Sequence, residues 1–192
     1  MTRLDALANK VDELYRKPKS GADPFIQWGY LNHLLVVAKF ARDIAILKSA
    51  NEEVCVAGAL LHDIADTAMS RFHKNHEEKS LEMARTLLAE TGFSGTEIAE
   101  IVNEVIVPHS CRDVLPTKLE GKVLATADAL AHFETDFYLY FAWENLGGED
   151  YLAFKKWTLQ KIEKDFNRKI FFDDTREKTR PNYEAIKRMF SK

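Results

Sequence analysis

The sequence predicts an all-α protein in which residues 1–192 form one domain, and three observations support this prediction. The chain contains only 8 glycines and 5 prolines, and so few helix breakers favour long helices over a β-structure with many turns. Apolar residues recur at intervals of three and four, as they do on the buried face of an amphipathic helix. Residues 170–172 are the one segment that resembles a strand.

Three helices are expected in the first third of the chain. Apolar residues at helical spacing predict a first helix over 2–16, followed by a Lys-Pro-Lys-Ser-Gly turn. The helical period returns over 27–48. Residues 49–51 can cap a third helix at about 52–66, which is mostly apolar and therefore expected at the centre of the fold. The polar residues 67–75 are expected to form a loop.

Further helices are expected at 76–90, around 98–107, and at about 117–143, 150–169 and 181–191. Gly92 is expected to stop the first of these. Pro108 is expected to end the second, because the residue before a proline leaves the α region. Gly147 and Gly148 are expected to separate the third from the fourth.

Composition and charge narrow the classes of function. A net charge of −3 excludes a globally basic nucleic-acid binder, and no nucleic-acid partner is expected. The N-terminal segment has charges throughout and lacks the apolar block of a signal peptide. The apolar run at 137–143 is too short to span a bilayer. Two cysteines, Cys55 and Cys111, indicate a reducing compartment, so we expect a soluble, cytoplasmic protein with no membrane partner.

The last segment, 155–192, has twelve basic and six acidic residues, a local charge of about +6 that leaves about −9 for the rest. A solvated helical face explains such a run of charges. The alternative is a flank that attracts anions beside a phosphate site.

Three polar positions interrupt the apolar faces of the predicted helices: His33, the pair His62-Asp63, and Asp128. Each alone has an ordinary explanation, as a hydrogen-bonded core histidine or a capping aspartate. Together they are harder to explain, because burying two carboxylates is costly unless a positive group compensates them. Imidazoles and carboxylates that converge from separate helices suit a divalent transition metal.

The order of these residues resembles the HD-domain superfamily of metal-dependent phosphohydrolases. The resemblance lies in HLLVVAKFARDIA after His33, AGALLHDIAD around His62-Asp63, and LEGKVLATADAL around Asp128. It covers about 28–141 and implies a compact helical bundle, with 150–192 as an added C-terminal helical extension.

The resemblance also implies a set of metal ligands and one or two divalent ions, of Mn, Fe, Co, Ni or Zn. The first ion would be held by His33, His62, Asp63 and Asp128, with Asp63 bridging to a second ion. His76 and His109 match the extra histidines of the two-metal subgroup and would bind that second ion. Two further histidines lie close in sequence: His73 is an alternative to His76, and His132 follows Asp128 by one turn, where it could support the ligands.

Two departures from the family pattern qualify this resemblance. Many stand-alone relatives have an acidic-Ala-Asp-Arg-Leu-Asp pattern around the last ligand, where this chain has TADALA from Thr126. The hydrolases of guanosine tetraphosphate have His-Asp-x-x-Glu-Asp, where this chain ends in Asp66-Thr67.

The resemblance predicts hydrolysis of a small phosphorylated substrate, a phosphomonoester or phosphodiester of a nucleotide-like metabolite, by a metal-activated water. Asp66 is the candidate to protonate the leaving group, with a surface acid at a helix end as the ordinary explanation. Two alternatives stay open. One is a diiron oxygenase of a small polyol or phosphonate, and the other is a non-catalytic sensor or binding module that keeps the metal.

Overall fold

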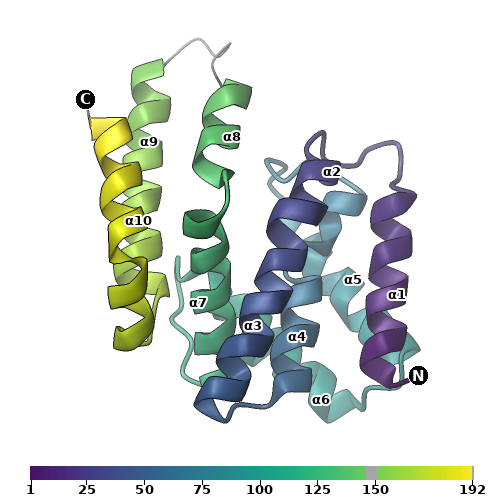
Figure 1. The fold of residues 1–192 in the computed structure, drawn as a ribbon. Helices are drawn as coiled ribbons and strands as arrows, with labels where there is room; N and C mark the ends of the chain where they lie inside the picture. The colour runs from purple at the N-terminus through teal and green to yellow at the C-terminus, as the bar shows by residue number, and fades with distance from the viewer. Residues whose placement is uncertain (146–150, 192) are drawn as a thin grey trace.

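A computed structural model describes residues 1–145 and 151–191, and all regular structure in these residues is helical, which confirms the all-α prediction. The α-helices are α1 (Arg3–Arg16), α2 (Ile26–Gly29), α3 (Leu35–Lys48), α4 (Glu52–Leu61), α5 (His76–Glu90), α6 (Gly95–Glu100), α7 (Leu119–Glu134), α8 (Phe137–Asn145), α9 (Tyr151–Lys164) and α10 (Asp173–Ser191). Figure 1 shows α3 and α4 side by side in the middle, with α1 on one flank and α9 and α10 on the other. In the described residues no helix is both long and apolar enough to cross a membrane.

Short turns of tighter or wider pitch connect or extend several helices. Three are π-helical, namely η1 (Tyr30–Leu34), η3 (Ile101–Ile106) and η5 (Asp165–Lys169), and two are 3₁₀ turns, η2 (Ile64–Thr67) and η4 (Val107–Ser110). A π-turn inserts one residue into the helix and rotates the side chains that follow, and such turns are frequent at functional sites. Here they contain His33, Asp165 and Lys169, all of which lie at the site described below.

Local capping explains several helix starts. Thr2 begins α1 with a capping box, in which its hydroxyl accepts from the backbone N–H of Asp5 and its own N–H donates to the Asp5 carboxylate. Asn51 begins α4 by accepting from the N–H of Val54 at 3.2 Å. Ser94 and Glu97 form a second capping box at α6. These caps satisfy backbone donors that have no partner within the helix.

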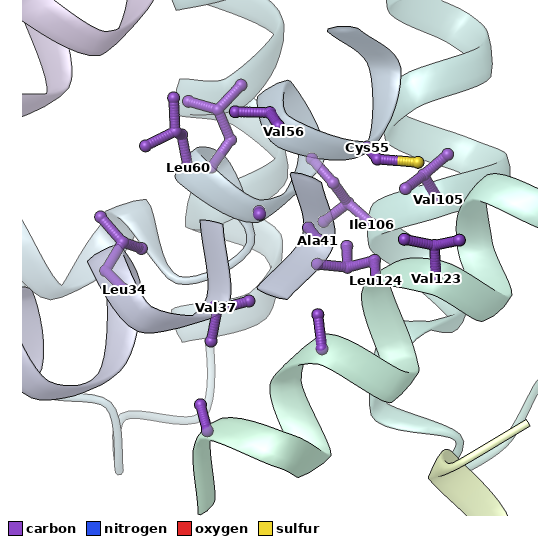
Figure 2. Packing of buried hydrophobic residues seen from close by; sticks show 14 of the residues in the cluster. Leu34, Val37, Ala41, Cys55, Val56, Leu60, Val105, Ile106, Val123 and Leu124 are labelled. Atoms are coloured by element: carbon purple, nitrogen blue, oxygen red, sulfur yellow. The ribbon is translucent and has the colours of Figure 1, made fainter. Parts of the chain in front are cut away.

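The core lies where α3, α4, η3 and α7 meet. Figure 2 shows side chains from these four elements pointing toward one another, among them Val37, Cys55, Val105 and Leu124. All four are fully buried. Gly58 lets α4 approach η3, since a β-carbon at this position would lie 2.9 Å from the Cγ1 atom of Val105. This tight packing fixes the relative positions of the helices that contain the polar residues of the site.

Two helix ends near the site differ from those predicted from the sequence. The helix expected over 52–66 ends at Leu61, because the backbone of Asp63 leaves the helical region and a 3₁₀ turn follows. The helix expected to end before Pro108 continues through η4 to Ser110. Pro108 stands in the first turn of η4, where the helix changes from π to 3₁₀ pitch.

Two further expectations about the second half were wrong. The helix expected over 117–143 is interrupted at Thr135, whose backbone is extended and whose hydroxyl accepts from the N–H of Phe137, so that α8 starts anew. The last helix begins at Asp173, not at Pro181, because Asp173 and Asp174 favour a helix N-terminus. Residues 170–172 form no strand. The expected break at Gly147 and Gly148 lies outside the described residues.

Candidate metal centre

Three neighbouring helical segments bring the predicted ligands together. His33 lies on η1, His62 caps the C-terminal end of α4 with Asp63 directly after it, and Asp128 lies in the middle of α7. His33, His62 and Asp128 are almost completely buried, at 3%, 2% and 4% exposure. The end of α4 at Leu61 is what turns Asp63 out of the helix and toward the cleft that it lines.

The donor atoms of these residues have the spacing of a metal site. His33 Nε2 lies 3.3 Å from His62 Nε2 and 3.3 Å from Asp128 Oδ1. Asp63 Oδ2 lies 3.5 Å from His62 Nε2 and 3.9 Å from His33 Nε2. Donors bound at ~2.1 Å to one ion lie ~3.0 to 3.4 Å apart, so a small contraction would place the donors of His33, His62 and Asp128 around one ion.

The imidazole orientations support the same conclusion. His62 Nδ1 donates to the carbonyl of Ala59 at 2.8 Å, and His109 Nδ1 donates to the carbonyl of Ile106 at 2.6 Å. Each bond leaves Nε2 as the unprotonated nitrogen, which is the tautomer that a metal ligand needs. Among the described residues His33 Nδ1 is buried without a hydrogen-bond partner, so packing and the Nε2 contacts hold this ring.

Burial sets the charge states of the donors. It lowers the pKa of His33 well below its ordinary value, and it lowers the pKa of His109 to about 4. Burial would raise the pKa of Asp128, but the charge of Lys169 beside it lowers this pKa instead. Neutral imidazoles beside an ionised carboxylate are the forms that bind a cation at neutral pH.

A second group of donors shares one residue, His62, with the first. His62, Asp63 and His109 each offer one atom, and these atoms lie within 4.8 Å of one another, as do those of His33, His62 and Asp128. The two groups meet at His62, and Asp63 follows it directly in the chain. The positions of Asp63 and His109 therefore agree with the predicted bridging and second-ion roles, which remain predictions.

His76 and Asp66 lie next to this centre but are bonded to each other. His76 Nε2 lies 2.8 Å from Asp66 Oδ1, and Arg71 donates to the other oxygen of the same carboxylate. Burial alone would lower the pKa of His76, but the bond to Asp66 and the charge of Asp63 raise it overall. Asp66 is 2% exposed and does not line the cleft, so its carboxylate orients Arg71 and His76. His73, the alternative to His76, is exposed.

Sequence reasoning missed the groups that the C-terminal helices contribute. Lys169 on η5 is 2% exposed and forms an ion pair with the Asp128 carboxylate. Asp165, also on η5, is fully buried and accepts from His132 Nδ1 at 2.8 Å and from the Tyr138 hydroxyl at 2.8 Å. His132 stacks on His33 with ring centroids 5.1 Å apart, as expected of a residue that supports the ligands. The basic composition of 155–192 was the one signal for these groups.

A cleft of about 440 Å³ opens onto the donors. His33, Asp63, His109 and Asp128 form its floor, and five cationic side chains and an aromatic group line the rest. The cations are Arg71, Arg112, Lys161, Lys164 and Lys169, and the aromatic residues are Phe72, Phe137, Phe141 and Trp157. Such a cleft combines donors for a metal with positive charge for an anion.

A comparison with protein families settles which family has this arrangement. The model of the HD domain matches residues 30–132, more than half of the chain. The chain belongs to the HD domain family. The match confirms the resemblance seen in the sequence, and it includes all the donors on the cleft floor. The HD segment ends before Lys161, Lys164 and Lys169, so these cations lie outside it.

Two curated relatives each match about half of the chain. Ribonuclease Y of Treponema denticola is 36% identical over 101 residues, which cover 53% of this chain and 18% of that protein. A deoxyguanosinetriphosphate triphosphohydrolase-like protein of Caldanaerobacter subterraneus is 31% identical over 117 residues, 55% of this chain and 34% of that protein. The chain thus covers only a minor part of each relative. No solved structure matches it significantly.

Proposed function

We propose that this HD protein is a metal-dependent phosphohydrolase that cleaves a phosphomonoester or phosphodiester of a small, nucleotide-like metabolite. The observation that supports this most is the cleft, in which a set of His and Asp donors lies beneath cationic side chains. A metal centre alone fits several chemistries. The added positive charge favours a substrate with an anionic group such as phosphate. Both relatives have names that refer to the cleavage of phosphate esters or anhydrides.

In this proposal the ligands of the first ion are His33, His62, Asp63 and Asp128, and His109 and His76 complete the second site. Divalent ions in such a site lower the pKa of a bound water and offset charge on phosphate oxygens. Manganese, iron, cobalt, nickel and zinc all suit these donors. His76 would have to exchange its bond to Asp66 for a bond to the ion.

The protein groups around the donors have separate roles. Lys169 offsets the charge of Asp128 and orients its carboxylate, since both are buried and paired. Arg71 lines the cleft and is held by Asp66, which places its guanidinium near the Asp63 side of the site. Asp66, the predicted proton donor to the leaving group, does not line the cleft, and both of its oxygens are bonded to Arg71 and His76. We therefore propose that Asp66 positions these two side chains.

The test is hydrolysis of p-nitrophenyl phosphate and bis(p-nitrophenyl) phosphate by chain reconstituted with Mn²⁺. Asp63→Ala removes the predicted bridging ligand and is expected to lower the rate by about 10³-fold or more, because the activated water depends on the metal. Asp43→Ala, an exposed carboxylate on α3 paired only with Lys39, is the control and should leave the rate unchanged.

Three outcomes would replace the proposal. Full activity of Asp63→Ala contradicts the ligand assignment. Iron as the bound metal, with oxygen uptake when a polyol or phosphonate is added, identifies the oxygenase. Bound metal with no turnover of either ester or of nucleotides identifies the non-catalytic module.

A further inference from the structure

One face of α9 lies against the cleft although α9 is outside the HD segment. Trp157, Gln160, Lys161 and Lys164 all line the cavity, and their spacing of three, one and three residues places them on one side of a helix. The eight residues from Trp157 to Lys164 span about 10 Å along the helix axis. This face therefore runs from the mouth of the cleft toward the donors.

Lys164 is a cation without a partner at the inner end of this face. Lys161 pairs with Asp165 at 3.1 Å and Lys169 pairs with Asp128, whereas no carboxylate of the described residues lies within ion-pair distance of Lys164. Lys164 is partly buried, and its surroundings lower its pKa because burial, Lys161 and Lys169 all oppose its charge. An anion in the cleft would supply the missing counter-charge.

Aromatic side chains lie at the other end of this face of α9, around Trp157. Phe72 and Trp157 remain 64% and 43% exposed, which is unusual for rings of this size beside a cavity. Trp157 stacks on Phe141 with centroids 6.0 Å apart. A second, apolar cavity of about 320 Å³ shares Phe72, Phe141 and Trp157 with the main cleft, so the aromatic surface continues directly from the cationic one.

We propose that this face of α9 selects the substrate, with a phosphate oxygen on Lys164 and a flat aromatic ring on Trp157 and Phe72, so that nucleoside phosphates are preferred over aliphatic phosphates. The inference rests on the proposed function for the position of the phosphate. Aromatic side chains stack on any nucleobase, so the surface explains a preference for a ring without reading its identity. A lysine provides a mobile point charge for the phosphate.

The test is calorimetric binding to the metal-free chain, with the four common ribonucleoside 5′-monophosphates and ribose 5-phosphate as probes. At least one nucleotide is expected to bind about fivefold or more tightly than ribose 5-phosphate, because the base stacks. Trp157→Ala should remove that preference, and Trp157→Phe should keep most of it. Lys164→Met should weaken every probe about tenfold, since a charge-assisted contact to phosphate is lost.

Matched controls lie on the same helix but do not line the cleft. Tyr151→Ala removes an exposed aromatic ring, and Lys156→Met removes an exposed cation; neither should change binding. Equal affinity for nucleotides and ribose 5-phosphate, or a preference that survives Trp157→Ala, would overturn the inference even if simple esters are hydrolysed. A preference that depends on Trp157 in a chain without hydrolytic activity would overturn the proposed function and leave this inference standing.

Discussion

The two parts of the molecule that meet at the cleft differ in what they contribute. The HD segment provides the donors, His33, His62, Asp63 and Asp128, from helices that otherwise pack in the apolar core. The C-terminal segment formed by α9 and η5 provides Trp157 and the cations Lys161, Lys164 and Lys169, but no member of either donor group. The donors thus lie within the family domain, and the buried cation that pairs with Asp128 lies in a segment outside it.

The same comparison applies to buried charge. Asp128 lies in the HD segment and Lys169 in the C-terminal helices, and each is nearly inaccessible to water. A buried carboxylate or ammonium is costly alone, so the two parts of the chain depend on each other when no metal is bound. By contrast, Lys48 and Asp174 join α3 to α10 at the surface, where water already solvates both charges.

The largest effect on stability is expected from Lys169→Met. Removing one partner of a buried pair leaves Asp128 without compensation, which should lower the free energy of unfolding of the metal-free chain by about 3 to 5 kcal/mol. A divalent ion at Asp128 would replace the lost positive charge, so Mn²⁺ should stabilise this variant more than wild type. Urea unfolding with chelator and with Mn²⁺ measures both quantities.

The control for this variant is Arg168→Met, which removes an exposed cation from the same turn and should change stability by less than about 0.5 kcal/mol. If Lys169→Met and Arg168→Met prove equally mild, the two parts of the chain are not joined through Asp128.

An intermediate effect on the free energy of unfolding is expected when the pH is lowered. Burial, His62 and Lys169 lower the pKa of His109 from 6.5 to about 4, so the unfolded chain gains a proton that the native chain does not. The free energy of unfolding of the metal-free chain should therefore fall as the pH drops from 6.5 toward 4, and this contribution is constant below that range. His109→Gln should remove about 2 to 3 kcal/mol of this fall.

Urea unfolding in chelator at a series of pH values measures the slope. His73→Gln, an exposed histidine near the same site, is the control and should leave the slope unchanged. A slope in His109→Gln equal to that of wild type would show that this imidazole is not held in the neutral form by its surroundings.

The smallest effect on stability is expected from the surface ion pair between Lys48 and Asp174. Lys48 Nζ lies 2.9 Å from Asp174 Oδ1, and the two side chains are 24% and 48% exposed. A double-mutant cycle with Lys48→Ala and Asp174→Ala should give a coupling of less than about 1 kcal/mol. A coupling that matches the effect of Lys169→Met would mean that surface contacts, not the buried pair, join the two parts.

The sequence predicted the HD segment better than the C-terminal helices for a physical reason. His62-Asp63 and Asp128 interrupt runs of buried apolar residues, and that contrast is visible without a structure. Lys169 and Asp165 lie in a helix rich in charges, where a buried ion pair has the same pattern as a solvated face. Composition showed the excess of positive charge but not which lysine faces the cleft.

Helix boundaries were also only partly predictable from the sequence. The bounds expected for the helix at 76–90 agree with α5, where His76 and Gly92 give local signals. The interruption at Thr135 depends on a hydroxyl that accepts from Phe137, and the continuation past Pro108 depends on the turn type, which a proline alone does not specify. Both features depend on local backbone geometry. Many different sequences adopt the same geometry, so the sequence alone does not specify it.

The most direct test of the central claim is the metal content of the purified chain. Elemental analysis of protein prepared without chelator should give about one to two divalent transition ions per chain for wild type. Asp63→Ala should retain almost none, and His76→Ala should lose one ion if the second site is occupied. Wild-type chain without metal that also fails to take up Mn²⁺, Fe²⁺ or Zn²⁺ would contradict the account.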